Sequence, residues 1–184
     1  PILGVDLGVA ESPAPAATRQ TSGQRLSPAR GGSAVREEAS RLVVLARGAR
    51  GWAALCRLVS AAHLRGERAR PQVTRDLVAQ YAADGHLAVL LGADSTVGQA
   101  CRRRRLDLAA AELRWWHHHV GAPVYVEICS HREVVGALRS SAAAARLLRV
   151  AWDTGSTAVL SNAGRFASAE QAPGADVLDA VRRL

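Results

Sequence analysis

The 184-residue chain contains no lysine and no methionine, and it has only one phenylalanine, two tyrosines and four tryptophans. All 24 basic side chains are therefore arginines. Since 48% of the residues are hydrophobic, alanine, valine and leucine must fill the interior, and the length suffices for one core. Arginine in place of lysine is typical of a GC-rich genome. The net charge of +8 also favours a polyanionic partner.

Cysteine is scarce as well. Cys56, Cys101 and Cys129 are an odd number of thiols at wide spacing, without a Cys-x-x-Cys pair. This pattern argues against a disulfide framework and against structural zinc, and it is typical of a reducing compartment. No apolar run approaches the roughly 20 residues of a membrane span, and no signal-peptide pattern is present. We therefore expect a cytoplasmic location and no membrane partner.

Several catalytic motifs are absent. The chain has no Walker loop, no G-x-G-x-x-G and no G-x-S-x-G. Cys101 has no local histidine, although we expect the four arginines of residues 102–105 to acidify its thiol somewhat. That arginine run is read as a solvated helix end, or alternatively as a phosphate-binding segment. Residues 117–119 are consecutive histidines, but about 100° separates neighbours on a helix, so they cannot share one metal ion.

One stretch, residues 42–64, organises the rest of the chain. Residues 42–46 (LVVLA) are a short apolar run typical of a buried strand, and residues 47–51 (RGARG) predict a turn. Apolar side chains then recur every three or four residues, which predicts an amphipathic helix whose buried face is formed by Trp52, Leu55, Leu58, Val59 and Ala62. Strand, turn and helix predict half of a βαβ unit.

The remaining segments repeat this alternation. Further strands are predicted at residues 1–10, 86–92, 124–128 and 157–160. Helices are predicted at residues 75–83 (with Thr74 as N-cap), 95–105, 107–119, 133–152 and 175–184. Residues 11–40, rich in Pro, Ala, Ser, Gly and Arg, predict a flexible insertion. Apolar strands separated by helices indicate an α/β fold with a parallel sheet, and pattern alone does not distinguish an open sheet from a barrel.

Three segments carry a family resemblance. Residues 42–71 (LVVLARGARGWAALCRLVSAAHLRGERARP), residues 124–131 (VYVEICSH), and residues 158–166 with 175–184 resemble, in order, the PHP domain of the bacterial DNA polymerase III alpha subunit. The high-GC actinobacterial form is the most similar. The resemblance implies a distorted, seven-stranded parallel β/α barrel. It also implies that residues 1–184 are a partial PHP domain, truncated at its N-terminal side.

The resemblance further implies a site for metal ions held by His, Asp and Glu. Working groups of β/α barrels lie at the carboxyl ends of strands, which points to Asp6, Arg47, residues 92–94, residues 127–131 and residues 162–165. Three positions keep a possible ligand, namely Asp6, Glu127 and His131. Three others have lost the family ligand, namely Arg41, Ala163 and Arg165. A guanidinium stays protonated and cannot ligate, so we expect a metal-free site whose arginines pair with Asp6 or Glu127.

Three functional hypotheses follow. The first is a structural PHP portion of a DNA polymerase III alpha subunit, inactive alone, whose whole protein is a DNA-directed DNA polymerase, a nucleotidyltransferase of replication or error-prone repair. It implies that residues 1–184 hold no cofactor and that Mg binds in a polymerase domain outside this segment. The implied partners are the rest of the polymerase chain, DNA through the whole protein, and replisome subunits such as the clamp or an exonuclease. The second is a metal-dependent phosphoesterase or 3′–5′ proofreading exonuclease with Zn or Mn. The third is an arginine-rich nucleic-acid-binding module. Replicase and translesion polymerase stay equally open.

Overall fold

The structure is a computed structural model that describes residues 2–10, 40–65, 72–162, 164 and 167–183. The predicted insertion therefore lies outside the described residues, except for Ser40, which begins a strand. In chain order the elements are β1 (Gly4–Val9), β2 (Ser40–Ala46), α1 (Gly48–Arg65), β3 (Gln72–Val73), α2 (Arg75–Ala82), β4 (Leu87–Leu91), α3 (Thr96–Arg102), α4 (Leu106–His119), β5 (Val124–Ile128), α5 (Ser141–Asp153), β6 (Thr157–Leu160), the 3₁₀ helix η1 (Ala169–Gln171) and α6 (Ala172–Arg183).

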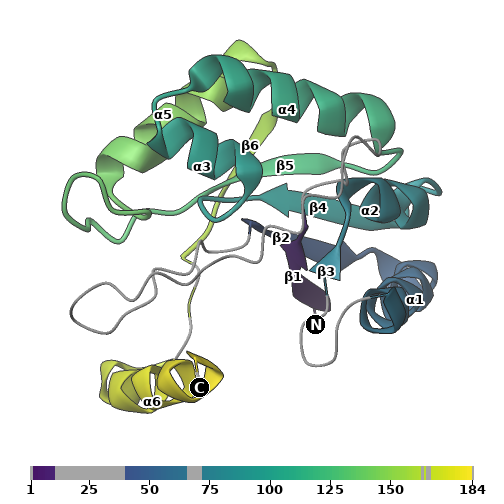
Figure 1. Ribbon diagram of the computed structural model, residues 1–184, viewed down its shortest axis with the longest axis horizontal. Helices are drawn as coiled ribbons and strands as arrows, with labels where there is room; N and C mark the ends of the chain where they lie inside the picture. Colours follow the sequence, from purple (N-terminus) through teal and green to yellow (C-terminus); the bar gives the residue numbers. More distant parts are fainter. Residues whose placement is uncertain (1, 11–39, 66–71, 163, 165–166, 184) are drawn as a thin grey trace, which may run out of the picture.

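The strands form one six-stranded mixed sheet in the order β3-β1-β2-β4-β5-β6 (Figure 1). Strands β4, β5 and β6 are mutually parallel, and β1 is parallel to β3. Strand β2, however, is antiparallel to both of its neighbours, β1 and β4. The α/β class is confirmed, but the wholly parallel sheet was wrong, and among the described residues the sheet does not close into a barrel. A continuous apolar run indicates that a strand is buried without indicating its direction.

The hydrophobic core lies on one face of this sheet. Strand register places alternate residues together on that face, and they pack with buried side chains of α1 to α5. The buried strand residues on it include Leu7, Leu42, Val44, Val89, Leu91, Val124 and Val126. The opposite face carries half-buried or exposed side chains, among them Asp6, Arg41, Val43, Leu90, Tyr125 and Glu127. One face is thus covered by helices, and the other holds most of the candidate site.

Side-chain hydroxyls cap the starts of α2 and α3, of which only the Thr74 cap was predicted from the sequence. The Thr74 hydroxyl accepts a hydrogen bond from the Leu77 amide at 3.2 Å and begins α2, as expected from the sequence. Ser95 begins α3 in the same way, since its Oγ accepts from the Gly98 amide at 3.2 Å. The Ser95 hydroxyl is buried and also donates to the Gly92 carbonyl at 2.6 Å. This cap fixes α3 against the end of β4.

Two helix boundaries differ most from the sequence prediction. Helix α1 begins at Gly48, so most of the predicted turn is helical, and Trp52 is 48% exposed while Ala54 takes its place in the core. Helix α5 begins only at Ser141 and not at residue 133. The segment before it forms a loop in which Gly136 has a φ of 100°. The alanine-rich segment of residues 142–145 predicts a helix strongly, and the sequence prediction extended that helix too far toward the N-terminus, across residues 133–140.

The remaining elements lie at the margins. Strand β6 is an edge strand whose Leu160 is 83% exposed. Helix α6 lies apart from the sheet in Figure 1. Within the part of the chain that the structure describes, no helix is long and apolar enough to span a membrane.

Candidate functional site at the ends of strands β4, β5 and β6

The antiparallel direction of β2 decides which residues meet at the candidate site. Its first residues, rather than its last, lie beside the carboxyl ends of β4 and β5, and the Arg41 amide donates to the Asp94 carbonyl at 3.0 Å. Arg47, which the barrel rule had placed in the site, lies at the other end of the sheet and donates to the Gly85 carbonyl at 2.9 Å. Including Arg47 was therefore wrong, because the rule assumes parallel strands.

Arg41 and Asp6 form an ion pair on the face of the sheet opposite the hydrophobic core. The Nε atom of Arg41 lies 3.1 and 3.0 Å from the two carboxylate oxygens of Asp6, and Nη2 donates to the Asp6 carbonyl at 3.2 Å. Both side chains are about half exposed. The sequence led us to expect that an arginine pairs with Asp6, and this contact is present. Asp6 thus faces a permanent positive charge.

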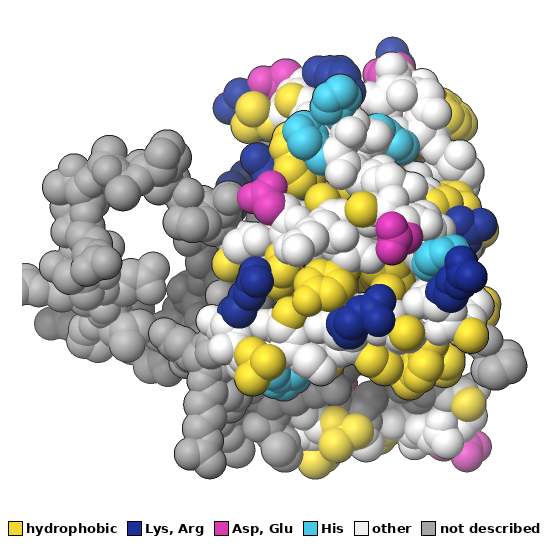
Figure 2. Space-filling model, turned by 90° about the vertical axis from the view of Figure 1, so that its right-hand side faces the viewer, with side chains coloured by type: hydrophobic (Ala, Val, Ile, Leu, Met, Phe, Trp, Pro, Cys, Tyr) yellow, Lys and Arg dark blue, Asp and Glu magenta, His cyan; other side chains and the backbone are white. Residues whose placement is uncertain are grey.

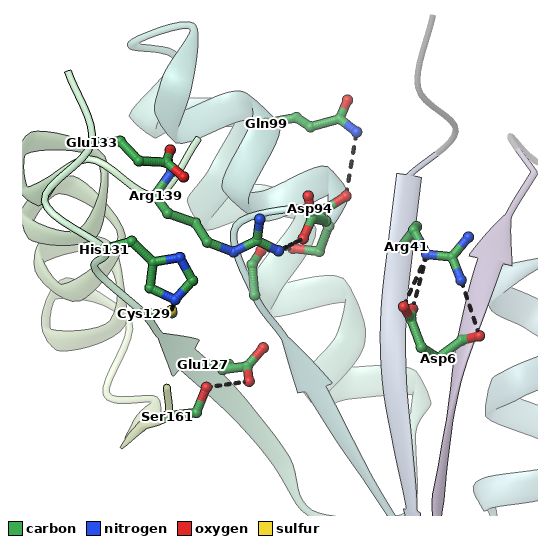
Figure 3. Close-up of polar contacts among 12 residues, drawn as sticks. Asp6, Arg41, Asp94, Gln99, Glu127, Cys129, His131, Glu133, Arg139 and Ser161 are labelled. Atoms are coloured by element: carbon green, nitrogen blue, oxygen red, sulfur yellow. Dashed lines mark hydrogen bonds and ion pairs between the residues drawn. The ribbon is translucent and has the colours of Figure 1, made fainter. Parts of the chain in front are cut away.

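A second ion pair joins the end of β4 to the loop before α5. Arg139 Nη2 lies 2.7 Å from Asp94 Oδ2 (Figure 3). The Arg139 amide donates to Glu133 Oε2 at 2.9 Å, and the side-chain amide of Gln99 donates to the Asp94 carbonyl at 3.3 Å. Sequence reasoning pointed to Asp94 but missed Arg139, because residues 133–140 were assigned to a helix.

Glu127 projects from β5 on the same face of the sheet as Asp6. Its Oε1 accepts a hydrogen bond from the hydroxyl of Ser161, which follows β6, at 2.5 Å. Gly92 makes room for the carboxylate, since a Cβ at that position would lie 2.5 Å from Glu127 Oε2. The candidate ligand Glu127 is therefore held by a neighbouring strand end and by the close approach of the β4 backbone.

His131 is held by main-chain and thiol contacts. Its Nε2 lies 2.9 Å from the Asn162 carbonyl oxygen and 3.3 Å from Cys129 Sγ. A carbonyl oxygen only accepts hydrogen bonds, so Nε2 is the donor in the contact with Asn162. Burial raises the pKa of the adjacent Cys129 thiol. The expectation of a hydrogen-bonded histidine at the strand end is met.

These side chains do not converge on one point. Figure 3 shows the Asp6–Arg41 pair standing apart from the residues around Asp94, Glu127 and His131. Among the described residues, no three His, Cys, Asp or Glu side chains are placed to share a metal ion. The donor set needed for a multinuclear site is therefore not formed by these residues. Ala163 and Arg165, the other two altered positions, lie outside the described residues.

The consecutive histidines of residues 117–119 and the thiol of Cys101 were also considered for chemistry in the sequence analysis. His117 Nε2 lies 2.8 Å from Ser156 Oγ, His119 Nδ1 lies 2.9 Å from the Trp115 carbonyl, and all three histidines of this helix end are exposed. Their separate partners agree with the expected solvated helix end. The expected acidification of Cys101 was wrong, because burial raises the pKa of its thiol to about 11 and outweighs the lowering by Arg146.

Comparison with known proteins gives the family. The PHP domain model matches residues 1–131, which is more than half of the chain. No curated protein is similar at the significance required of a match. The match covers β1 to β5 and the site residues Asp6, Arg41, Asp94, Glu127 and His131. The chain therefore belongs to the PHP domain family.

Proposed function

We propose that this chain is the PHP portion of a bacterial DNA polymerase III alpha subunit and that it has a structural, non-catalytic role. The support for the polymerase context is the resemblance of residues 42–71, 124–131, 158–166 and 175–184 to that subunit. In this proposal the partners are the remainder of the polymerase chain and, through it, DNA and replisome subunits. The whole protein acts in the cytoplasm, and its polymerase chemistry resides in another domain.

The single observation that carries the non-catalytic role is the Arg41–Asp6 ion pair. The carboxylate of Asp6 lies 3.0 Å from Arg41 Nε, where a metal-binding PHP site would need a deprotonated donor with no cation beside it. Arg139 places a second guanidinium against Asp94. Because an arginine does not lose its proton near neutral pH, both carboxylates are already neutralised by side chains. The family's metal chemistry is thus replaced by fixed ion pairs.

Phosphoesterase and 3′–5′ exonuclease assays on the 184-residue chain, with added Zn or Mn, test the non-catalytic role. We expect no turnover above a metal-only blank. Activity that disappears in Glu127→Gln, but persists in a control such as Arg149→Gln on the surface of α5, would instead establish the metal-dependent alternative. The control removes an exposed side chain of α5 whose partner, Asp153, is not a residue of the candidate site.

The polymerase context has its own test. Reading the coding sequence on both sides of this segment should reveal upstream strands of the PHP domain and, downstream, a domain with clustered carboxylates for two metal ions. A coding sequence that ends without such a domain would contradict the polymerase assignment and leave the family membership untouched.

A further inference from the structure

Helix α6 leaves apolar side chains uncovered. Val177 and Leu178, in the middle of this 12-residue helix, are 62% and 65% exposed. Figure 1 shows α6 lying apart from the sheet and from the helices that cover it. An isolated helix of this length is marginally stable in water, and most helices are stabilised by packing an apolar face on another surface. Helix α6 therefore presents an apolar face that is available for packing.

The free edge of the sheet presents an apolar surface of its own. β6 is an edge strand, and its last residue, Leu160, is in register with the buried Ile128 of β5. Residues in register on neighbouring strands point to the same face, so Leu160 lies on the face that carries the hydrophobic core. Leu160 is nevertheless 83% exposed. The core face is thus incompletely covered at β6.

Helix α5 borders the same edge. Its Arg146 reaches toward α3, because Nε donates to the Cys101 carbonyl at 3.0 Å. Trp152 lies about 120° around the helix axis from Arg146 and is 68% exposed. The flank of α5 that meets α3 is therefore occupied, whereas the side that carries Trp152 is open. We name the following residues the α5–β6 edge: the exposed Leu160 and Trp152, and the half-buried Leu148 and Ala158.

The chain topology directs α6 to this edge. Strands β4, β5 and β6 are parallel neighbours, and the helices α3 to α5 that connect them pack on the core face. Parallel crossover connections share one hand, so each new helix is added beside the previous one. Helix α5 packs against α3 and α4, and the next place in this series is beside α5, over β6. Helix α6 is the next α-helix after β6 in the chain.

We propose that α6 has a docked position on the α5–β6 edge, in which Val177 and Leu178 cover Leu160 and Trp152. Residues 161–171 join β6 to α6. An extended residue spans about 3.3 Å, so this segment exceeds several-fold the roughly 8–10 Å that separate the axes of packed helices. Both surfaces belong to one chain, and their effective concentration is therefore high. The occupant of the edge is the chain's own α6, which closes on it as a strap.

Docking acts on the candidate site, because the connecting segment begins there. The Ser161 hydroxyl donates to Glu127, and the Asn162 carbonyl accepts from His131 Nε2 at 2.9 Å. A docked α6 fixes the far end of this segment and so limits the movement of both contacts. The proposal requires neither bound metal nor the polymerase context. Its failure is therefore distinguishable from failure of the proposed function.

Amide hydrogen exchange of α6, followed by mass spectrometry, tests the proposal. The test variant is Trp152→Gln/Leu160→Gln, which makes the α5–β6 edge polar and leaves the sequence of α6 unchanged. The matched control is Trp52→Gln/Leu64→Gln, which replaces the same two residue types at exposed positions of α1. Figure 2 shows the side of the molecule that carries α1, where apolar side chains are interspersed with arginines.

We expect the amides of α6 to exchange about ten-fold faster in the test variant than in the wild type, because a docked helix is protected and an undocked one is not. The control should leave the exchange of α6 unchanged. The amides of β4 should stay protected in both variants, which verifies that the core is folded. Equal exchange of α6 in all three proteins would overturn the proposal.

Disulfide cross-linking tests the position of the docked helix. In a Cys56→Ser background, which removes the exposed native thiol, the test pair is Leu160→Cys/Leu178→Cys and the control pair is Leu64→Cys/Leu178→Cys. A disulfide requires the two Cα atoms to approach within about 7 Å. At high dilution we expect the test pair to form an intramolecular disulfide about ten-fold faster than the control pair. Equal rates, or a disulfide between two copies as the main product, would overturn the proposal.

Discussion

The Arg41–Asp6 ion pair makes a quantitative prediction for a double-mutant cycle. The variants are Arg41→Gln, Asp6→Asn and the double substitution. Asp6→Asn removes a charge at constant side-chain size, and Arg41→Gln removes the opposite charge and shortens the side chain. Arg41 Nε contacts both carboxylate oxygens at 3.0 to 3.1 Å, but the two side chains are 48% and 54% exposed. Solvent screens a pair at that exposure, and such pairs contribute about 0.2–1 kcal/mol. We expect a coupling free energy of about 0.5 kcal/mol.

Two other pairs calibrate this value. Arg149–Asp153 is an i,i+4 pair on α5 with exposures of 67% and 54%, for which we expect about 0.3 kcal/mol. Arg139–Asp94 is shorter, at 2.7 Å, and less exposed, at 31% and 36%, so its coupling should be the largest of the three.

Urea unfolding at low and high salt measures all three cycles. The couplings should decrease at high salt, because screening weakens exposed pairs. A coupling of zero or of opposite sign for Arg41–Asp6, with a normal value for Arg149–Asp153, would refute the reasoning. It would mean that Asp6 is not neutralised by Arg41 in solution, and a cation-binding role for that carboxylate would then be favoured.

Three further predictions concern close packing, a helix cap and the burial of a thiol. Gly98→Ala should destabilise the chain by about 1–3 kcal/mol in urea unfolding, because the added Cβ would collide with the carbonyl oxygens of Gly92 and Ala93. An unchanged free energy of unfolding would contradict this packing. Ser95→Ala should cost about 1–2 kcal/mol, since a buried cap of α3 is lost, and thermal unfolding measures it. At pH 8 a thiol reagent should modify the exposed Cys56 and spare the buried Cys101, because a pKa of about 11 keeps the Cys101 thiol protonated. Mass spectrometry measures the labelling of each cysteine, and equal labelling of the two would refute this prediction.

The sequence predicted those parts of the fold that local chemistry decides. Thr74 is a recognisable cap, and the apolar runs of β4 and β5 are bounded by glycine or proline, so these elements appear close to where they were expected. Strand β3 has only two residues, too few to produce a pattern. The direction of β2 depends on contacts with β1 and β4, which are remote in sequence. Periodicity contains no information on such contacts.

The candidate site was likewise predictable only in part from the sequence. Asp6, Arg41 and Glu127 were found because they align with family segments, and the Asp6–Arg41 contact agrees with the charge argument. Arg139 was missed because residues 133–140 were assigned to the alanine-rich helix that in the structure begins only at Ser141. The raised pKa of Cys101 was missed because sequence shows its arginine neighbours but not its burial.

We infer that arginine ion pairs occupy the positions at which a PHP site would bind metal. Elemental analysis for Zn, Mn and Fe tests it most directly, on the 184-residue chain purified without chelator and again after incubation with each metal and desalting. We predict metal content far below one ion per chain in both samples. Stoichiometric metal that is lost in Glu127→Gln or Asp6→Asn would contradict the claim and establish a metal-binding PHP site.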